Sequence, residues 1–223
     1  MIKLSDRLKS ILSFIRQSGG FLDIGSDHAL IPMALKERGF LGKIYASEVT
    51  EGPFLRMKKA IIESGYDITP LLGDGLSICP SDVDQILISG MGGITIVKIL
   101  VQGASALKKV RHLVLEPQSN ADLVLRKMNE LGFKEIGGAY VKEKNKVYPV
   151  LIYEQGSETR DELEMNYSSY ALNHGDSVLM DYLTNEKIYL EKIPKTISAA
   201  DLSRIEAKLE LLDEALKRLR SSF

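Results

Sequence analysis

The chain has 223 residues and a formal net charge of -1, so it lacks the overall basicity by which many nucleic-acid-binding proteins are recognised. Its single cysteine, Cys79, excludes an intrachain disulfide, and no apolar run reaches the length needed to span a membrane. We therefore expect a cytoplasmic protein that makes no membrane contact.

The N-terminal segment, Met1 to Gln17, is predicted to form an amphipathic helix, and Gly19 and Gly20 end it. Its apolar residues recur at steps of three and four, at Leu4, Leu8, Ile11, Leu12 and Ile15. We expect this helix to cover one edge of a sheet.

Between residues 21 and 153, short apolar runs alternate with helical patterns. Strands are predicted at 21–24, 43–49, 68–72, 85–89 and 112–116, and helices at 29–38, 51–64, 94–101 and 121–131. Two last runs, 133–141 and 147–153, flank a charged turn and are predicted to pair antiparallel. This alternation indicates an α/β fold with a doubly wound parallel sheet that ends in an antiparallel hairpin.

The composition changes after residue 156, where strand-like runs stop, so domains are expected at 1–156 and 157–223. Helices are predicted within 162–172, over 178–193, and from an N-cap at Ser198 to about Arg220. The last one carries a heptad-like seam formed by Leu202, Ile205, Leu209, Leu212, Leu216 and Leu219. We expect the seam to pack against the preceding helix in a monomer, with dimerisation through these helices as the alternative.

Four predicted strands end in loops that should meet at one edge of the sheet, because parallel strands share their carboxyl edge. The loops contain Asp23–His28, then Glu48, then Gly73–Gly75, and finally Gly90–Gly93. Glycines allow the backbone to approach a ligand closely, and a carboxylate at the end of the second strand suits a ribose diol.

The choice of cofactor follows from the first loop. The GxGxxG turn of dinucleotide sites is absent, and Asp27 would place a carboxylate near a pyrophosphate. S-adenosyl-L-methionine carries a sulfonium and an ammonium but no phosphate, so we expect it instead. Asp74 could accept the adenine amino hydrogen, while Asp23 and Asp27 could face the ammonium or the substrate.

The segments DIGSDHALIP, SEVTEGPF, LLGDGL and ISGMGG resemble, in this order and spacing, the bacterial tRNA adenine-22 N1-methyltransferase family (TrmK). The resemblance spans most of residues 1–156, and the helical tail is similar too. It implies a Rossmann-like class I methyltransferase domain, a coiled-coil-like helical domain, and methyl transfer from S-adenosyl-L-methionine to N1 of an adenine in the tRNA D-loop region. One departure is Glu116, in LEPQ, where the family has a neutral amide.

Carried over to this sequence, the resemblance implies a set of site residues. Asp27 would be catalytic, by stabilising the positive charge that develops on the base; its alternative role is to tie down the loop. The cofactor would contact Asp23, Gly25, Ser26, Glu48, Val49, Asp74, Gly75, Gly90 and Met91. No metal is expected.

Binding of tRNA would require a cationic surface. The candidates are Lys3, Arg7, Lys9 and Arg16 in the first helix, and Lys98, Lys108, Lys109 and Arg111 near the fourth crossover. Two alternatives stay open at this point: a class I methyltransferase with a different RNA, protein or small-molecule substrate, and a non-catalytic RNA-binding or oligomerising protein.

Overall fold

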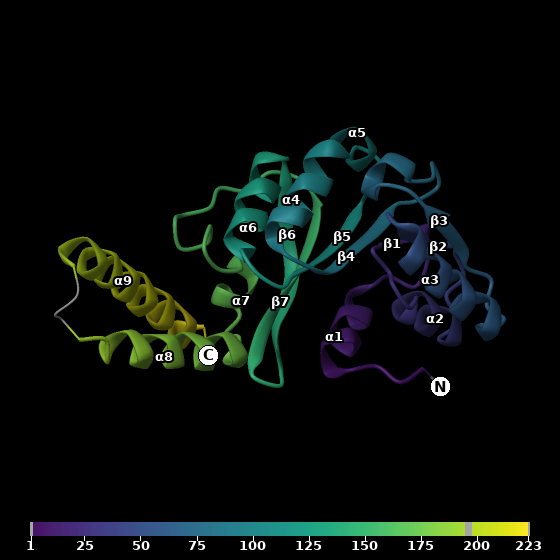
Figure 1. The fold of residues 1–223 in the computed structure, drawn as a ribbon. Coiled ribbons are helices and arrows are strands. Elements are labelled where there is room, and N and C mark those ends of the chain that lie inside the picture. The colour runs from purple at the N-terminus through teal and green to yellow at the C-terminus, as the bar shows by residue number, and fades with distance from the viewer. Residues whose placement is uncertain (1, 195–197, 223) are drawn as a thin grey trace.

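The structure, a computed structural model, describes residues 2–194 and 198–222. Its centre is a seven-stranded sheet with the order β3-β2-β1-β4-β5-β7-β6, in which β1 to β5 are parallel and β7 runs antiparallel to β5 and β6 (Figure 1). The predicted Rossmann-like sheet is confirmed. The strands are β1 (Phe21–Ile24), β2 (Ile44–Glu48), β3 (Thr69–Leu72), β4 (Gln85–Met91), β5 (His112–Pro117), β6 (Phe133–Glu143) and β7 (Lys146–Gln155).

Helices cover both faces of the sheet, because successive strand residues point to opposite faces and most of them are apolar. Phe21 and Leu87 belong to one apolar core, whereas Leu22 and Ile86 belong to the other. The first core includes α1 (Asp6–Phe14), α2 (Leu30–Glu37) and α3 (Glu51–Ser64). The second includes the 3₁₀ turn η1 (Gly75–Ile78), α4 (Gly93–Gln102), α5 (Ala104–Leu107) and α6 (Ala121–Glu130).

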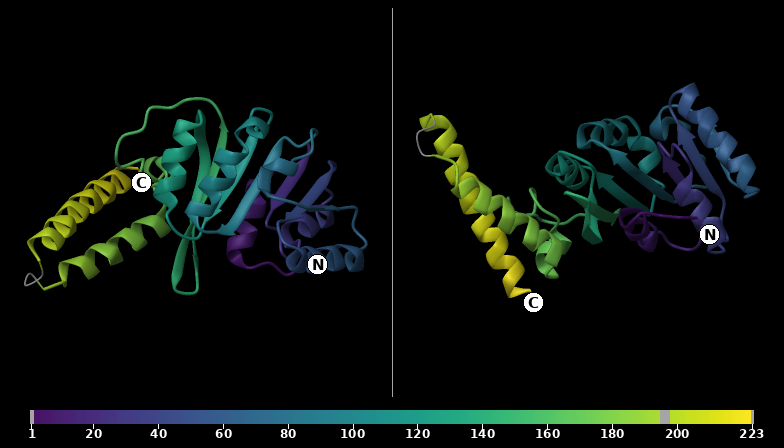
Figure 2. Two further views of the ribbon diagram at one scale, coloured as in Figure 1. Left: turned by 45° about the horizontal axis from the view of Figure 1, so that its top comes forward. Right: turned by 60° about the horizontal axis from the view of Figure 1, so that its bottom comes forward.

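The helical tail contains α7 (Ser169–Asn173), α8 (Ser177–Glu191) and α9 (Ala199–Ser221). Helices α8 and α9 form an antiparallel pair that projects away from the sheet (Figure 2). The C-terminal part of the seam packs within one chain, since Leu212, Leu216 and Leu219 share a buried cluster with Leu183 of α8 and Tyr140 of β6. The choice between a monomer and a dimer stays a prediction. The domain boundary after residue 156 stays a prediction.

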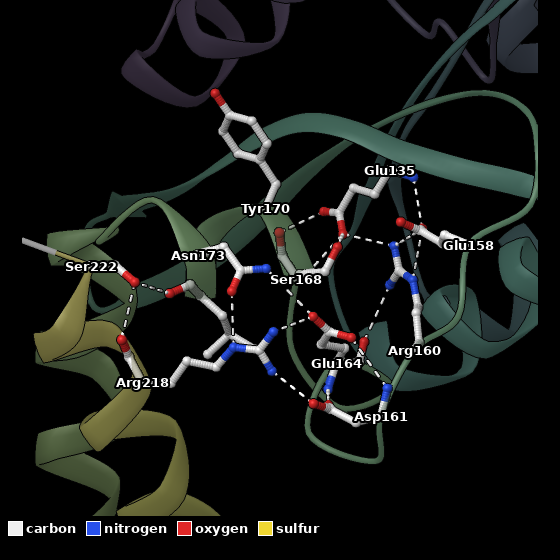
Figure 3. A network of polar contacts seen from close by, with 12 residues as sticks. Glu135, Glu158, Arg160, Asp161, Glu164, Ser168, Tyr170, Asn173, Arg218 and Ser222 are labelled. Atoms are coloured by element: carbon white, nitrogen blue, oxygen red, sulfur yellow. Dashed lines mark hydrogen bonds and ion pairs between the residues drawn. The ribbon is translucent and has the colours of Figure 1, made fainter.

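A buried polar network joins the tail to β6 (Figure 3). The Arg160 side chain is 1% exposed and lies 2.8 Å from the Glu135 carboxylate, which also accepts a hydrogen bond from the Ser169 N–H group at 2.9 Å. On the neighbouring turn, Arg218 of α9 pairs with Asp161 at 2.8 Å. Because the charges of Arg160 and Glu135 are desolvated, they must stay paired, so this pair anchors the tail at one place on the sheet.

The predicted bounds of two helices were wrong, since both helices are shorter than expected. The first helix begins at Asp6 because the Ser5 hydroxyl caps the Leu8 N–H group, and it ends at Phe14 because the Gln85 side chain holds Arg16 and Ser18 in a non-helical conformation.

The helix predicted within 162–172 is reduced to α7. Residues 162–167 form turns instead, since the side chains of Asp161 and Glu164 bond to each other's backbone N–H groups. Across residues 2–194 and 198–222, no helix combines the length and apolarity needed to cross a bilayer.

Candidate active site

The loops after the first three strands are hydrogen-bonded to one another at the carboxyl edge of the sheet. The N–H groups of Gly25 and Ser26 both donate to the Ser47 carbonyl, at 2.9 and 3.1 Å, and the Gly73 N–H donates to the Glu48 carbonyl at 2.9 Å. The sequence prediction that these loops meet at one edge is therefore correct, and the residues expected to bind the cofactor come together there.

The first cavity at this edge has a volume of about 290 Å³, and we call it the Glu48 cavity. Glu48, which is 8% exposed, and Asp74 supply carboxylates to its wall, and Val49 and Ile99 supply apolar surface. Carboxylates that accept O–H and N–H bonds, next to apolar walls, suit a nucleoside.

Glu48 also positions the first loop. Its Oε1 accepts a hydrogen bond from the Asp27 N–H group at 2.7 Å. Asp27 has a φ of 45° and Ala29 a φ of 53°, and a left-handed conformation is costly for residues other than glycine. The Glu48 carboxylate thus helps to hold a strained turn beside the cavity, which is a role that the sequence did not indicate.

The second cavity has a volume of about 280 Å³, and we call it the Asp23 cavity. Asp23 is 5% exposed and accepts a hydrogen bond from the Ser26 hydroxyl at 2.6 Å. Burial raises the pKa of Asp23 to about 7; the Ser26 bond lowers this pKa, and the charge of Glu48 raises it further. A buried carboxylate of this kind suits a cationic group, because a nearby positive charge favours its ionised form.

The two cavities meet at Gly25 and Met91, which line both of them. Gly25 has a φ of +73°, and a Cβ atom built on it would lie 2.1 Å from the Met91 Cε. The positive φ favours glycine at this position, and the close contact shows that the Met91 side chain fills the space beside its Cα. One extended ligand could pass over this junction and occupy both cavities.

Asp27 lines the Asp23 cavity with a half-exposed side chain. Its carboxylate lies 3.2 Å from Arg56 Nη2 and 3.3 Å from His28 Nε2. These pairs fit the loop-tying role, while the exposure and the strained backbone fit a contact with substrate. The catalytic role of Asp27 stays a prediction.

Glu116, the residue at which the resemblance suggested a departure from the family, has a structural role. Its side chain is fully buried, and its Oε2 accepts hydrogen bonds from Arg7 Nη1 and from the Gly90 N–H group, both at 2.8 Å. Burial raises the pKa of Glu116, whereas Arg7 lowers it. The Glu116 carboxylate is thus paired with Arg7 of α1, and it holds the backbone of the Gly90 loop in place.

The cations predicted to bind RNA do not form one surface. Arg7 is 16% exposed and pairs with Glu116 and Glu143, and Arg16 pairs with Glu154. Lys3 and Lys9 are exposed near α1, where Lys9 pairs with Asp6. Lys108, Lys109 and Arg111 precede β5 and lie at the opposite, amino edge of the sheet. Their role in RNA binding stays a prediction.

Comparisons with known proteins match this arrangement. A family model described as "TrmK: tRNA (adenine(22)-N(1))-methyltransferase" matches residues 21–221. The chain is 31% identical to the tRNA (adenine(22)-N(1))-methyltransferase of Bacillus subtilis, over 98% of this chain and 96% of that protein.

Solved structures are similar over nearly the whole chain. Streptococcus pneumoniae Sp1610, crystallised with S-adenosyl-L-methionine, has a TM-score of 0.87 and 29% identity, covering 96% of this chain and 100% of that one. The B. subtilis m1A22 tRNA methyltransferase TrmK has a TM-score of 0.81 and 28% identity, covering 100% and 99%. The predicted family, enzyme class and cofactor are confirmed. The chain belongs to the TrmK family of tRNA (adenine(22)-N(1))-methyltransferases.

Proposed function

We propose that this chain methylates N1 of adenine 22 in tRNA at the junction of the Glu48 and Asp23 cavities. The observation that carries this proposal is the meeting of the two cavities at Gly25 and Met91. One cavity has the carboxylates and apolar walls that a nucleoside needs, and the other has a buried carboxylate suited to an ammonium group.

The residues of both cavities fit S-adenosyl-L-methionine, which supplies an electrophilic methyl group when bound. In the Glu48 cavity, Glu48 with Val49 would hold the ribose, and Asp74 with Gly75 would hold the adenine. In the Asp23 cavity, Asp23 and Ser26 would hold the methionine part, with Gly25, Gly90 and Met91 beneath it. The raised pKa of Asp23 supports this orientation, because an ammonium would restore the ionised carboxylate.

The acceptor makes modest chemical demands. Adenine N1 has a free lone pair, so no proton has to be removed before it attacks, and the main task of the site is to orient the base. Methylation makes the base cationic, and the Asp27 carboxylate at the wall of the Asp23 cavity would stabilise that charge. The base must leave its pair or stack to enter the cavity.

The proposal extends to the setting of the enzyme. We place the enzyme in the cytoplasm as a monomer in which α8 and α9 pair within one chain. No metal has a role in the proposed reaction. Half-buried Leu202, Ile205 and Leu209 mark where a dimer would form instead. Light scattering on the purified chain distinguishes these two states.

The direct test is transfer of labelled methyl from S-adenosyl-L-methionine to an unmodified tRNA transcript, followed by nucleoside digestion. The expected product is N1-methyladenosine, and a transcript with guanosine at position 22 is the matched control. Label that is absent from tRNA although the cofactor binds, or label that persists in the control, contradicts the proposal.

A further inference from the structure

A groove lies between the sheet and the helical tail, separate from the Glu48 and Asp23 cavities. It consists of two cavities of about 380 and 290 Å³ that share Val147 of β7 and Tyr182 of α8. The loop after β5 and the β6–β7 hairpin form one wall, and α8 and α9 form the other. We call it the Tyr182 groove.

The loop after β5, which lines the groove, is hydrogen-bonded to the Gly90–Gly93 loop of the active site. The Gln118 N–H group, in the loop that lines the groove, donates to the Met91 carbonyl at 2.8 Å, and the Gly93 N–H donates to the Ser119 carbonyl at 2.7 Å. A Cβ atom built on Gly90 would lie 3.8 Å from Gln118 Nε2. A chain-like ligand with one unit in the Asp23 cavity can therefore continue into the groove.

The lining of the groove combines three kinds of groups. Tyr182 is 42% exposed and offers an aromatic surface, and exposed Lys142 supplies positive charge at the hairpin end. Side-chain amides come from Asn145, Asn166 and Asn185. Aromatic surfaces for stacking, amides for base edges and lysines for phosphates together are typical of sites for unpaired RNA.

The positive charge of the β6–β7 hairpin also favours RNA as the ligand of the groove. Lys144 and Lys146, at and beside the turn, are exposed like Lys142. Asp181 lies in the same cavity as Lys142, and Asp122 and Lys208 lie in the other one, where Lys208 is bound to Tyr167 and Glu186. The excess of positive charge at the hairpin end therefore comes from the three lysines of the hairpin together. A phosphate backbone would be attracted to this end, which lies on the carboxyl side of β5, like the active site.

The opposite wall is held in place before any ligand binds. The Arg160–Glu135 pair and the Arg218–Asp161 pair fix the tail against β6 (Figure 3). A groove whose two walls are already positioned spends less free energy on ordering when it binds a flexible strand.

We propose that the Tyr182 groove binds unpaired tRNA nucleotides next to the methylated adenine, with one base stacked on Tyr182 and phosphates near Lys142. This inference rests on the proposed function, because the groove can hold nucleotides next to adenine 22 only if adenine 22 itself enters the Asp23 cavity. The groove then selects for RNA in which adenine 22 is presented on a single-stranded stretch.

The test compares steady-state kinetics and tRNA binding of four variants of the full chain. Tyr182→Ala removes the stacking surface, and Tyr182→Phe keeps it. Tyr189→Ala, at a 68% exposed tyrosine on the same helix that does not line the groove, is the control for Tyr182→Ala. Lys142→Gln removes the charge at the hairpin end.

We expect Tyr182→Ala to raise KM for tRNA about tenfold or more while kcat and the Kd for S-adenosyl-L-methionine stay unchanged. Tyr182→Phe and Tyr189→Ala should behave like the unsubstituted chain. For Lys142→Gln, the plot of log K for tRNA against log salt concentration should lose about 0.7 of its slope, as expected for one lost phosphate contact.

Two outcomes separate this inference from the proposed function. If the unsubstituted chain methylates tRNA and Tyr182→Ala and Lys142→Gln match Tyr189→Ala, the groove is not an RNA site and the proposed function stands. If the unsubstituted chain binds S-adenosyl-L-methionine but neither binds nor methylates tRNA, the proposed function fails and takes this inference with it.

Discussion

Asp23 makes cofactor binding dependent on pH in a way that can be calculated. Its carboxyl group is buried in the Asp23 cavity with a pKa of about 7, so near neutral pH about half of it is protonated before the ligand binds. If Asp23 faces the ammonium of S-adenosyl-L-methionine, only the ionised carboxylate binds well. Acid should therefore weaken binding, because the ligand must displace a proton.

The size of the effect follows from the pKa. At pH 6 the protonated form outnumbers the ionised form by about ten to one, and at pH 8 the ratio is reversed. The apparent Kd should thus be about tenfold larger at pH 6 than at pH 8, which corresponds to about 1.4 kcal/mol. In Asp23→Asn this dependence should vanish and binding should be weak throughout.

Isothermal titration calorimetry at several pH values measures this directly. The ligand's own amino group titrates with a pKa of about 8, so the informative quantity is the ratio of Kd values for the unsubstituted chain and Asp23→Asn at each pH. The ligand's titration can change this ratio by no more than about twofold at pH 8, which is small against the tenfold effect expected from Asp23. A ratio that stays constant between pH 6 and pH 8 would refute the assignment of Asp23 to the ammonium.

The same shift predicts how the stability of the ligand-free enzyme varies with pH. The folded pKa of about 7 lies above the ordinary value of 3.8, so the folded state binds the proton more tightly than the unfolded state. This stabilisation, about 4 kcal/mol, is fully present below pH 4 and is lost as the pH rises through 7. Asp23→Asn should lack this component, which chemical denaturation at pH 5 and pH 8 can measure.

Three further predictions concern other parts of the site and the tail. Asp27→Asn should lower kcat about 100-fold with little change in cofactor Kd, whereas Glu48→Ala should raise that Kd about tenfold or more; equal losses of affinity in both would remove the catalytic role of Asp27. Gly25→Ala should cost about 1–2 kcal/mol of stability and weaken cofactor binding, since its φ is +73°; an unchanged Tm and Kd would contradict this. Arg160→Met should cost about 3–5 kcal/mol because it leaves the buried Glu135 carboxylate without a cation, and an unchanged free energy of unfolding in urea would contradict this.

The elements of the sheet could be predicted because their signals are local. Apolar runs bounded by glycine identified the strands, and the parallel order then placed the loops of Asp23, Glu48, Asp74 and Gly90 at one edge. The structure agrees to within a few residues at most strand ends. The strands β4 and β6 are each two residues longer than predicted and β7 is three residues longer. Strand β4 continues through Gly90 and Met91 because Met91 pairs with Pro117 beyond an irregularity in the register.

The pairing of distant charges could not be predicted from the sequence. Glu116 and Arg7 are separated by 109 positions, and Arg160 and Glu135 by 25, so nothing in the local pattern of either residue indicates its partner. Tertiary bonds also contribute to the loss of the helix predicted after residue 160. Buried Arg160 donates to the Glu164 carbonyl, and Glu164 binds Arg218 of α9, in addition to the local bonds between Asp161 and Glu164.

The position of Arg7 changes the view of how this chain meets its substrate. As the sole basic residue of the first helix directly at the Asp23 cavity, it was the natural candidate for an RNA contact, yet Glu116 and Glu143 bind its guanidinium and Tyr148 lies 5.3 Å from it. A cation that is paired twice offers little net charge to a phosphate, and its withdrawal would leave Glu116 buried and unpaired. The positive charge that attracts tRNA must then come from other residues on this side. In the described part of the sheet, β6 and β7 are the long strands that extend past the end of β5, and the exposed lysines lie at the hairpin between them. Glu116 thus makes Arg7 a structural link between α1 and the Gly90 loop, and if the proposed groove is correct, the hairpin lysines and Lys98 at the Glu48 cavity are the cations left on this side to bind RNA.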